Sequence, residues 1–333
     1  MSVESVSDSF PIHDGIRPYE SGQGYVLRMA AENRLLGLHQ IKAMLGKSRF
    51  AVLDGDDAPA LGQLFGADES DLRFALGRLL TGDGNGDYKF AGGPIGRSYF
   101  VNRMYPRTCP ECVHEHGQCD LSWDVSLVVA CERHMVLLTD RCRHCGRQLS
   151  WNRSALNVCG CGNWIEATPN IGIPRDLEIH FAHWVRSCVA RRIGVTEKPV
   201  RSADSPLPLM TLIRPLSLDG GLRVVYALGT AATYDKEKGN ATINCRPRAA
   251  MAKARYVLAS AADLAEKIVR LERVEFRITR PTAVIGLLAE SMSAQDSPQD
   301  RSLAYSILYE VLKQKSVSSW RGTFPQLSQM SLF

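Results

Sequence analysis

Four short pairs of cysteine or histidine decide the fold: CPEC at 109–112, CERH at 131–134, CRHC at 142–145 and CGC at 159–161. Eight of the ten cysteines of the chain lie within this stretch. Ligands separated by one or two residues can face one ion from a tight turn, and two such pairs complete a tetrahedral zinc site. The stretch therefore predicts two structural zinc ions.

The order of the pairs allows two groupings. In the sequential grouping, which we favour, the first ion takes Cys109, Cys112, Cys131 and His134, and the second takes Cys142, Cys145, Cys159 and Cys161. In a cross-braced grouping the two Cys-x2-Cys pairs would share one ion, and spacing alone does not exclude it. Other residues compete for these positions, and we interpret them as side chains outside the sites: His114, His116, Cys119 and His144. The tryptophans at 123, 151 and 164 are expected to pack over the sites.

Bulk composition limits the class of protein. The chain has 333 residues, of which 45% are hydrophobic and 23% charged, so it can bury a core and is not disordered throughout. It has neither an apolar run long enough for a membrane helix nor a secretory signal pattern at its start, so we expect a cytoplasmic location. In that reducing compartment metal binding explains clustered cysteines better than disulfides do. The two thiolate-rich sites would lower the formal charge of +5 to about +2, so net charge is weak evidence for a DNA partner.

The sequence around the cysteine stretch predicts a mainly α-helical protein. We expect an N-terminal helical domain over residues 1–96, a tandem zinc-binding module over 97–170 and a C-terminal helical domain over 171–333. Residues 20–45 have a helical pattern with a break at Gly37. Three apolar stripes predict C-terminal helices around 177–189, 257–268 and 303–312.

Two segments of the N-terminal domain need separate interpretation. Leu61–Phe65 and Leu72–Leu79 form two short apolar faces joined by a turn at Gly66, which predicts either a helix-turn-helix or an ordinary helical hairpin. The second helix begins with Asp68, Glu69 and Asp71, which suit contact with a protein better than contact with phosphates. Residues 81–96 are rich in glycine, and we interpret them as a flexible linker.

The same motifs argue against an enzyme. A catalytic zinc usually keeps one coordination position open, whereas both sites here are closed by four ligands. The motifs HExxH, GxxxxGK[ST] and GxSxG are absent, and the deaminase order of His-x-Glu before Pro-Cys-x-x-Cys is reversed. A zinc hydrolase or deaminase would have to use a nearby carboxylate such as Glu111 or Glu115. Any nucleotide-driven step must therefore come from a partner.

Several of these motifs resemble the TniQ/TnsD family of transposition proteins. They are RTCPEC (107–112), Trp123, Cys131-x2-His134, LLTDRCRHCG (137–146) and CGCG (159–162). PYESGQGYVLRMAAEN (18–33) is similar to the opening of that family, with Glu20 and Arg28 in place, and WRGTFPQL (320–327) is similar to a weaker tail pattern. Cys119 departs from the family pattern, which has an aromatic or polar residue there.

The resemblance implies a role in choosing where a transposon inserts. It implies an adaptor that links a DNA target or an RNA-guided CRISPR complex of the Cascade type to an AAA+ regulator, and through it to a DDE transposase. By resemblance alone it also implies a homodimer, and it carries over the eight zinc ligands named above. The alternative is a zinc-containing, sequence-specific transcription regulator. Direct reading of DNA would require a basic face, for which the candidates are Arg246, Arg248, Lys253, Arg255, Arg133, Arg141, Arg143 and Arg147.

Overall fold

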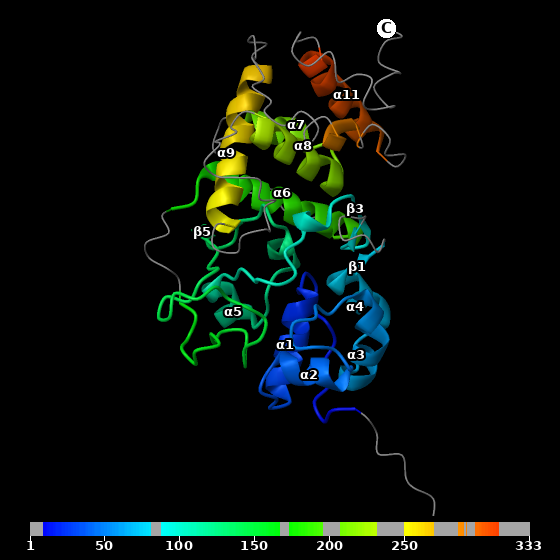
Figure 1. Cartoon of the computed structure of the whole chain (residues 1–333), viewed down its shortest axis with the longest axis vertical. Coiled ribbons are helices and arrows are strands. Elements are labelled where there is room, and N and C mark those ends of the chain that lie inside the picture. Colours follow the sequence, from blue (N-terminus) through cyan, green and yellow to red (C-terminus); the bar gives the residue numbers. More distant parts are fainter. Residues whose placement is uncertain are drawn as a thin grey trace, which may run out of the picture. The chain divides into compact units, whose positions relative to one another are not determined.

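The computed structural model describes residues 9–80, 88–166, 173–195, 207–231, 250–269, 286–289, 291 and 297–312. The prediction of a mainly helical protein is confirmed (Figure 1). The chain divides into two compact units, Met1–Arg175 with Val185–Glu197 and Asp176–Trp184 with Lys198–Phe333. The division into three domains stays a prediction. None of the helices in the described ranges has the length and apolar character needed to cross a bilayer.

The first unit begins with two helices, α1 (Gly22–Glu32) and α2 (Leu38–Met44). Ser21 caps α1 by accepting a hydrogen bond from the N–H of Gly24. The apolar residues of α1, such as Tyr25 and Leu27, are fully buried. Between the helices Gly37 has a φ of +130°, and a Cβ there would collide with the carbonyl of Arg153. Glycine is thus required where this predicted break meets the zinc-binding segment.

A buried ion pair fastens the residues before α1 to the helix. Arg28 donates from Nε to Oε1 of Glu20 at 2.7 Å and from Nη2 to Oε2 at 2.9 Å. The same guanidinium reaches Asp14 at 2.6 Å and the carbonyl of Gly15 at 3.1 Å. The Glu20 side chain is completely buried, and it also accepts from the N–H of Arg17. The two residues that the family pattern singled out are therefore partners in one buried network.

The predicted helical pair follows as α3 (Ala58–Phe65) and α4 (Glu69–Leu76), after a short 3-10 turn, η1 (Gly55–Asp57). Gly66 ends α3 in the left-handed conformation, with a φ of 78°. Asp68 caps α4 by accepting from the N–H groups of Ser70 and Asp71. The acidic start of α4 is thereby explained as capping that also complements the helix dipole.

Part of the segment interpreted as a flexible linker is ordered structure, so that interpretation was wrong for residues 88–95. Strands β1 (Arg78–Leu79), β2 (Tyr88–Phe90) and β3 (Gly93–Ile95) form an antiparallel sheet in that order. Tyr88, Phe90 and Ile95 are buried, which is why the hairpin is fixed. Residues 81–87 lie outside the described ranges.

The rest of the first unit consists of short elements: η2 (Ser98–Phe100), α5 (Pro110–His116), η3 (Leu121–Asp124), β4 (Ala130–Cys131) and β5 (Val136–Leu137). The insert between the first two ligand pairs packs back onto the start of α1. The N–H of Ser21 donates to the carbonyl of Cys119 at 2.8 Å, and the N–H of Leu121 donates to the carbonyl of Tyr19 at 2.6 Å. The zinc-binding segment and the first helices consequently share one core.

Helix α6 (Asp176–Arg192) contributes its C-terminal half to this unit. Arg186 bonds to Asp120, lies 3.1 Å from Glu132 and stacks over the ring of Tyr19. Arg192 donates to the carbonyl of Phe90 at 2.7 Å. These contacts hold the end of α6 against the insert and the small sheet.

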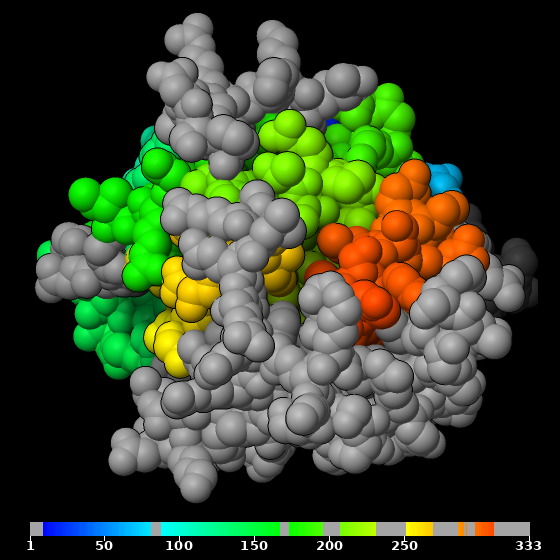
Figure 2. Space-filling view, turned by 90° about the horizontal axis from the view of Figure 1, so that it is seen from above, coloured from blue at the N-terminus to red at the C-terminus, as the bar shows by residue number. Residues whose placement is uncertain are grey.

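The second unit is helical throughout its described ranges. It contains the start of α6, α7 (Pro208–Ile213), α8 (Leu218–Ala231), α9 (Ala250–Val269) and α11 (Pro298–Leu312). Helix α8 contacts both α9 and α11, and Figure 2 shows its yellow-green atoms beside the yellow atoms of α9 and the orange atoms of α11. The three predicted stripes fall on α6, α9 and α11, whereas α8 was not predicted. Cys245, Arg246, Arg248 and the tail at 320–327 lie outside the described residues.

Candidate metal centres

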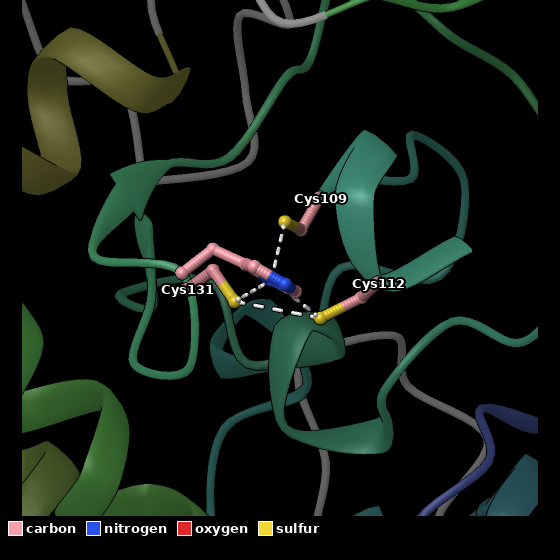
Figure 3. A group of neighbouring side chains, drawn as sticks. Cys109, Cys112 and Cys131 are labelled. Carbon is pink, nitrogen blue, oxygen red and sulfur yellow. Dashed lines mark hydrogen bonds between the residues drawn. The ribbon is translucent and has the colours of Figure 1, made fainter. Parts of the chain in front are cut away.

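The first cluster joins the four residues of the sequential grouping. Figure 3 shows the side chains of Cys109, Cys112 and Cys131 converging from α5 and from the β4–β5 hairpin. Nδ1 of His134 lies 3.4 Å from Sγ of Cys109, 3.2 Å from Sγ of Cys112 and 3.7 Å from Sγ of Cys131. The four ligand atoms all lie within 4.8 Å of one another.

These distances fit a tetrahedral zinc site. With Zn–S of about 2.3 Å and Zn–N of about 2.0 Å, tetrahedral geometry separates two sulfurs by about 3.8 Å and a sulfur from a nitrogen by about 3.5 Å. The sulfurs of Cys112 and Cys131 are 3.6 Å apart. The donor set therefore fits zinc without rearrangement of the backbone, and a bound zinc ion would supply folding free energy to this segment.

The second cluster joins Cys142, Cys145, Cys159 and Cys161, whose sulfurs also lie within 4.8 Å of one another. The sulfurs of Cys142 and Cys161 are 3.7 Å apart, and those of Cys145 and Cys159 are 3.8 Å apart. Both values match the tetrahedral expectation for a site with four thiolates. The structure thus brings together the sequential grouping and not the cross-braced one.

Local backbone geometry explains how each pair faces its partner. Pro110 occupies the first position of α5, where its missing N–H is not needed, so Cys109 immediately precedes the helix and Cys112 lies one turn inside it. In the second cluster the N–H of Gly146 donates to the carbonyl of Cys142 at 2.9 Å, and the N–H of Gly162 donates to that of Cys159 at 2.8 Å. Both glycines have a positive φ, which closes these two turns tightly.

The thiols differ in how readily they ionise. Hydrogen bonds from Cys109 and Cys112 lower the pKa of Cys131 to about 2. Its neighbours give up their protons with more difficulty, since hydrogen bonding to Cys112 and Cys131 raises the pKa of Cys109. In the second cluster a hydrogen bond from Asn163 lowers the pKa of Cys161 to about 6. Hydrogen bonding to Arg147 also lowers the pKa of Cys145. The first cluster thus begins with one readily formed thiolate and the second with two, and the remaining protons would leave as metal binds.

Residues that competed for ligand positions lie outside both clusters. His114, His116 and His144 are exposed, and Cys119 is buried with its sulfur 3.8 Å from Oγ1 of Thr108. Trp123 and Trp151 are buried, whereas Trp164 is 63% exposed. Packing of these rings over the sites stays a prediction. The residues that pack among the second cluster are instead Leu149 and Ile165.

Two buried arginines near the clusters were not anticipated. Arg107 donates to the carbonyls of Ser126 and Val128, and burial lowers its pKa to about 10. Arg153 is also buried, and its guanidinium nitrogens have no hydrogen-bond partner among the described residues. Burial lowers the pKa of Arg153, and the electrostatic influence of Cys119 and Cys159 opposes this effect. Nothing local in the sequence separates these two arginines from exposed ones.

Two closed Cys/His clusters in a mainly helical scaffold define a protein of the zinc-finger class. Residues 11–138 match the family model TniQ, so this part of the chain is similar to the TniQ family. The matched region includes the first cluster and ends before the second. A search of curated proteins found no match. The TniQ domain marks this chain as a transposition-associated protein.

Proposed function

We propose that this protein is a non-catalytic adaptor that selects the target site of a transposon. In this role it binds a target DNA or an RNA-guided CRISPR complex of the Cascade type, and it recruits an AAA+ regulator that engages a DDE transposase. The observation that carries the proposal is the TniQ match over residues 11–138. A homodimer is part of the same proposal.

The arrangement of the clusters supports a structural role for zinc. Each cluster offers four ligand atoms, which fills a tetrahedral site and leaves no position for a reacting water. Glu111 and Glu115, the carboxylates a zinc hydrolase would need, instead contact ligands: Glu111 lies 3.2 Å from Sγ of Cys109, and Glu115 lies 3.0 Å from Nε2 of His134. We assign two structural zinc ions to the eight ligands and no catalytic residue to the chain.

The α3–α4 pair is the candidate recognition element. Its second helix presents Asp68, Glu69 and the exposed Asp71 at its N-terminus, where they would repel DNA phosphates. Such a surface suits a basic protein partner better than a groove of DNA. We therefore propose protein contact for this element.

The basic candidates near the clusters are accounted for within the fold. Arg143 lies 3.1 Å from Glu166, and Arg133 lies 3.9 Å from Asp120. Arg141 donates to the carbonyl of Gly146, and Arg147 bonds to Cys145. On α9, Arg255 lies 2.6 Å from the buried Glu178. The exposed pair of Arg143 with Glu166 is weak and can exchange for phosphate, whereas the pair of Arg255 with Glu178 is largely buried.

A reconstituted pull-down tests the proposal. Zinc-loaded protein should retain a candidate AAA+ regulator, and the charge reversal Asp71→Lys on α4 should weaken retention of the protein partner that α4 contacts. Asp263→Lys, an exposed reversal on α9, is the matched control. A protein that retains neither the regulator nor a Cascade-type complex and that binds no target DNA would contradict the proposed adaptor function.

A gel shift with salt titration separates the two modes of target choice. Direct DNA reading predicts specific binding that weakens steeply with salt, because each phosphate contact releases counterions. Docking on a CRISPR complex predicts weak binding to naked DNA and tight binding to the complex. Specific duplex binding without any ATPase partner would instead favour the zinc-containing transcription regulator.

A further inference from the structure

The imidazole of His134 makes contacts on both of its ring nitrogens. Nδ1 faces the sulfurs of Cys109, Cys112 and Cys131 at 3.2–3.7 Å. Nε2, on the opposite edge of the ring, lies 3.0 Å from Oε2 of Glu115. A neutral imidazole can offer one nitrogen to a metal only if the other carries the proton, and a carboxylate at that second nitrogen fixes the tautomer.

Glu115 reaches His134 because α5 supplies both the ligands and the carboxylate. Cys112 and Glu115 are three residues apart on this helix and so lie on the same face. The end of α5 is fixed from the other side, since Arg17 donates from Nη1 to the carbonyl of His116 at 2.8 Å. Gly117 then ends the helix in the left-handed conformation. Glu115 is consequently held in place by the helix that carries Cys112.

We infer that Glu115 is a positioning residue of the first metal centre. Its carboxylate holds the His134 ring with the proton on Nε2 and with Nδ1 directed at the three sulfurs, and it makes Nδ1 a better donor to zinc. The inference rests on the zinc occupancy proposed above for this cluster. The Glu115 side chain is 51% exposed and that of His134 is 20% exposed, so solvent moderates the effect without abolishing it.

The other carboxylates near the clusters lack this arrangement. Glu111 lies on the same helix but accepts from the thiol of Cys109, a contact that ends once that sulfur binds metal as a thiolate. Glu166 lies near the second cluster and pairs with Arg143. Since the contact of Glu166 is to an arginine and not to a ligand, Glu166→Gln serves as a matched control.

The test measures zinc affinity of the full chain by competition with a chromophoric chelator. Glu115→Ala should weaken one of the two zinc ions by about 10- to 100-fold, the range found when such outer partners are lost. Glu115→Gln keeps an oxygen that can accept from Nε2–H and should lose less than Glu115→Ala. Glu166→Gln should leave both affinities unchanged. Unchanged zinc affinity in Glu115→Ala would overturn the inference.

A second readout reports the tautomer directly. In ¹⁵N-edited NMR spectra of histidine-labelled, zinc-loaded protein, His134 should show a metal-bound Nδ1 and a protonated Nε2. A metal-bound Nε2 would overturn the inference even if affinity fell. A wild-type chain that holds no zinc in the first cluster would overturn both this inference and the proposed metal site, whereas failure of the partner pull-down alone would leave Glu115 unaffected.

Discussion

The substitution Arg28→Met should destabilise the first unit strongly. It removes the two bonds at 2.7 and 2.9 Å that satisfy the carboxylate of Glu20, whose side chain has no exposed surface. The Glu20 carboxylate would then keep only one of its hydrogen-bond donors among the described residues, the backbone N–H of Arg17. Removal of one partner from a buried ion pair costs about 3–5 kcal/mol, which is a large part of the roughly 5–15 kcal/mol that stabilises a typical domain.

The converse substitution, Glu20→Gln, should cost less. Arg28 would keep Asp14 at 2.6 Å and the carbonyl of Gly15 at 3.1 Å, so its charge stays partly compensated. The free energy of unfolding should then fall by the contribution of one or two charge-assisted hydrogen bonds, about 1–3 kcal/mol. In the double variant neither buried charge remains, so its cost should be smaller than the sum of the two single costs.

Urea unfolding of the zinc-saturated protein measures these differences, with the fluorescence of Trp123 and Trp151 reporting on the first unit. Both rings are buried there. Zinc must be held in excess, because metal release would add its own dependence on concentration. An Arg28→Met variant within about 1 kcal/mol of wild type, or strictly additive costs, would refute the reasoning.

Three further perturbations have definite expected results. Elemental analysis should find two zinc ions per wild-type chain and one zinc ion per chain in either Cys112→Ser or Cys145→Ser. Of these two variants, only Cys112→Ser should speed amide hydrogen exchange at the start of α1. Loss of both ions in either variant would contradict independent sites. Burial raises the pKa of the partly buried Asp124 to about 7, opposed by a hydrogen bond from Ser21. The folded state therefore holds this proton more tightly than the unfolded state, and the stability it contributes is lost as pH rises from about 4 through 7. In chemical denaturation Asp124→Asn should gain on wild type as pH rises from 4 to 8.5, by at most about 4 kcal/mol in total and less for the partial exposure. Gly37→Ala should lower the melting temperature, because it adds strain at a φ of +130° to a clash with the carbonyl of Arg153.

The sequence allowed prediction of features that depend on local spacing. The eight Cys and His residues were readable because ligand pairs one or two residues apart form within a single turn. The long helices α6 and α9 were readable because their apolar residues repeat with the helical period. The assignment of these eight side chains to bound zinc stays a prediction.

Features that depend on tertiary packing were missed. Helix α8 contains Gly220, Gly221 and Gly229, which read as helix breakers in the sequence. In the structure a Cβ at Gly221 would enter the ring of Trp184, and one at Gly229 would meet the carbonyl of Val257. These glycines permit close approach of neighbouring helices. The spacing of apolar residues in the sequence does not reveal such contacts.

The hairpin at 88–95 was hidden for a related reason. Its strands have three residues each, which is too short for an alternating pattern to stand out beside Gly92 and Gly93. What fixes it is burial of Tyr88 and Phe90 against the rest of the first unit, together with the bond from Arg192 to the carbonyl of Phe90. The glycine-rich composition thus correctly predicted turns in this segment, but it gave no indication of the strands between them.

The first cluster also explains how a segment with so little regular structure can support the start of α1. Strands β4 and β5 have only two residues each, so their ladder alone cannot fix the loop from Gly117 to Asp120. That loop nevertheless bonds to the chain before α1. Nε2 of Gln118 donates to the carbonyl of Pro18, and the carbonyl of Cys119 accepts from the N–H of Ser21. A tetrahedral ion joined to both Cys112 and Cys131 would close the loop between them and hold its ends in place in the folded chain. Since Glu20, just before α1, is also bound by Arg28, metal in the first cluster and the buried ion pair would constrain the same piece of backbone.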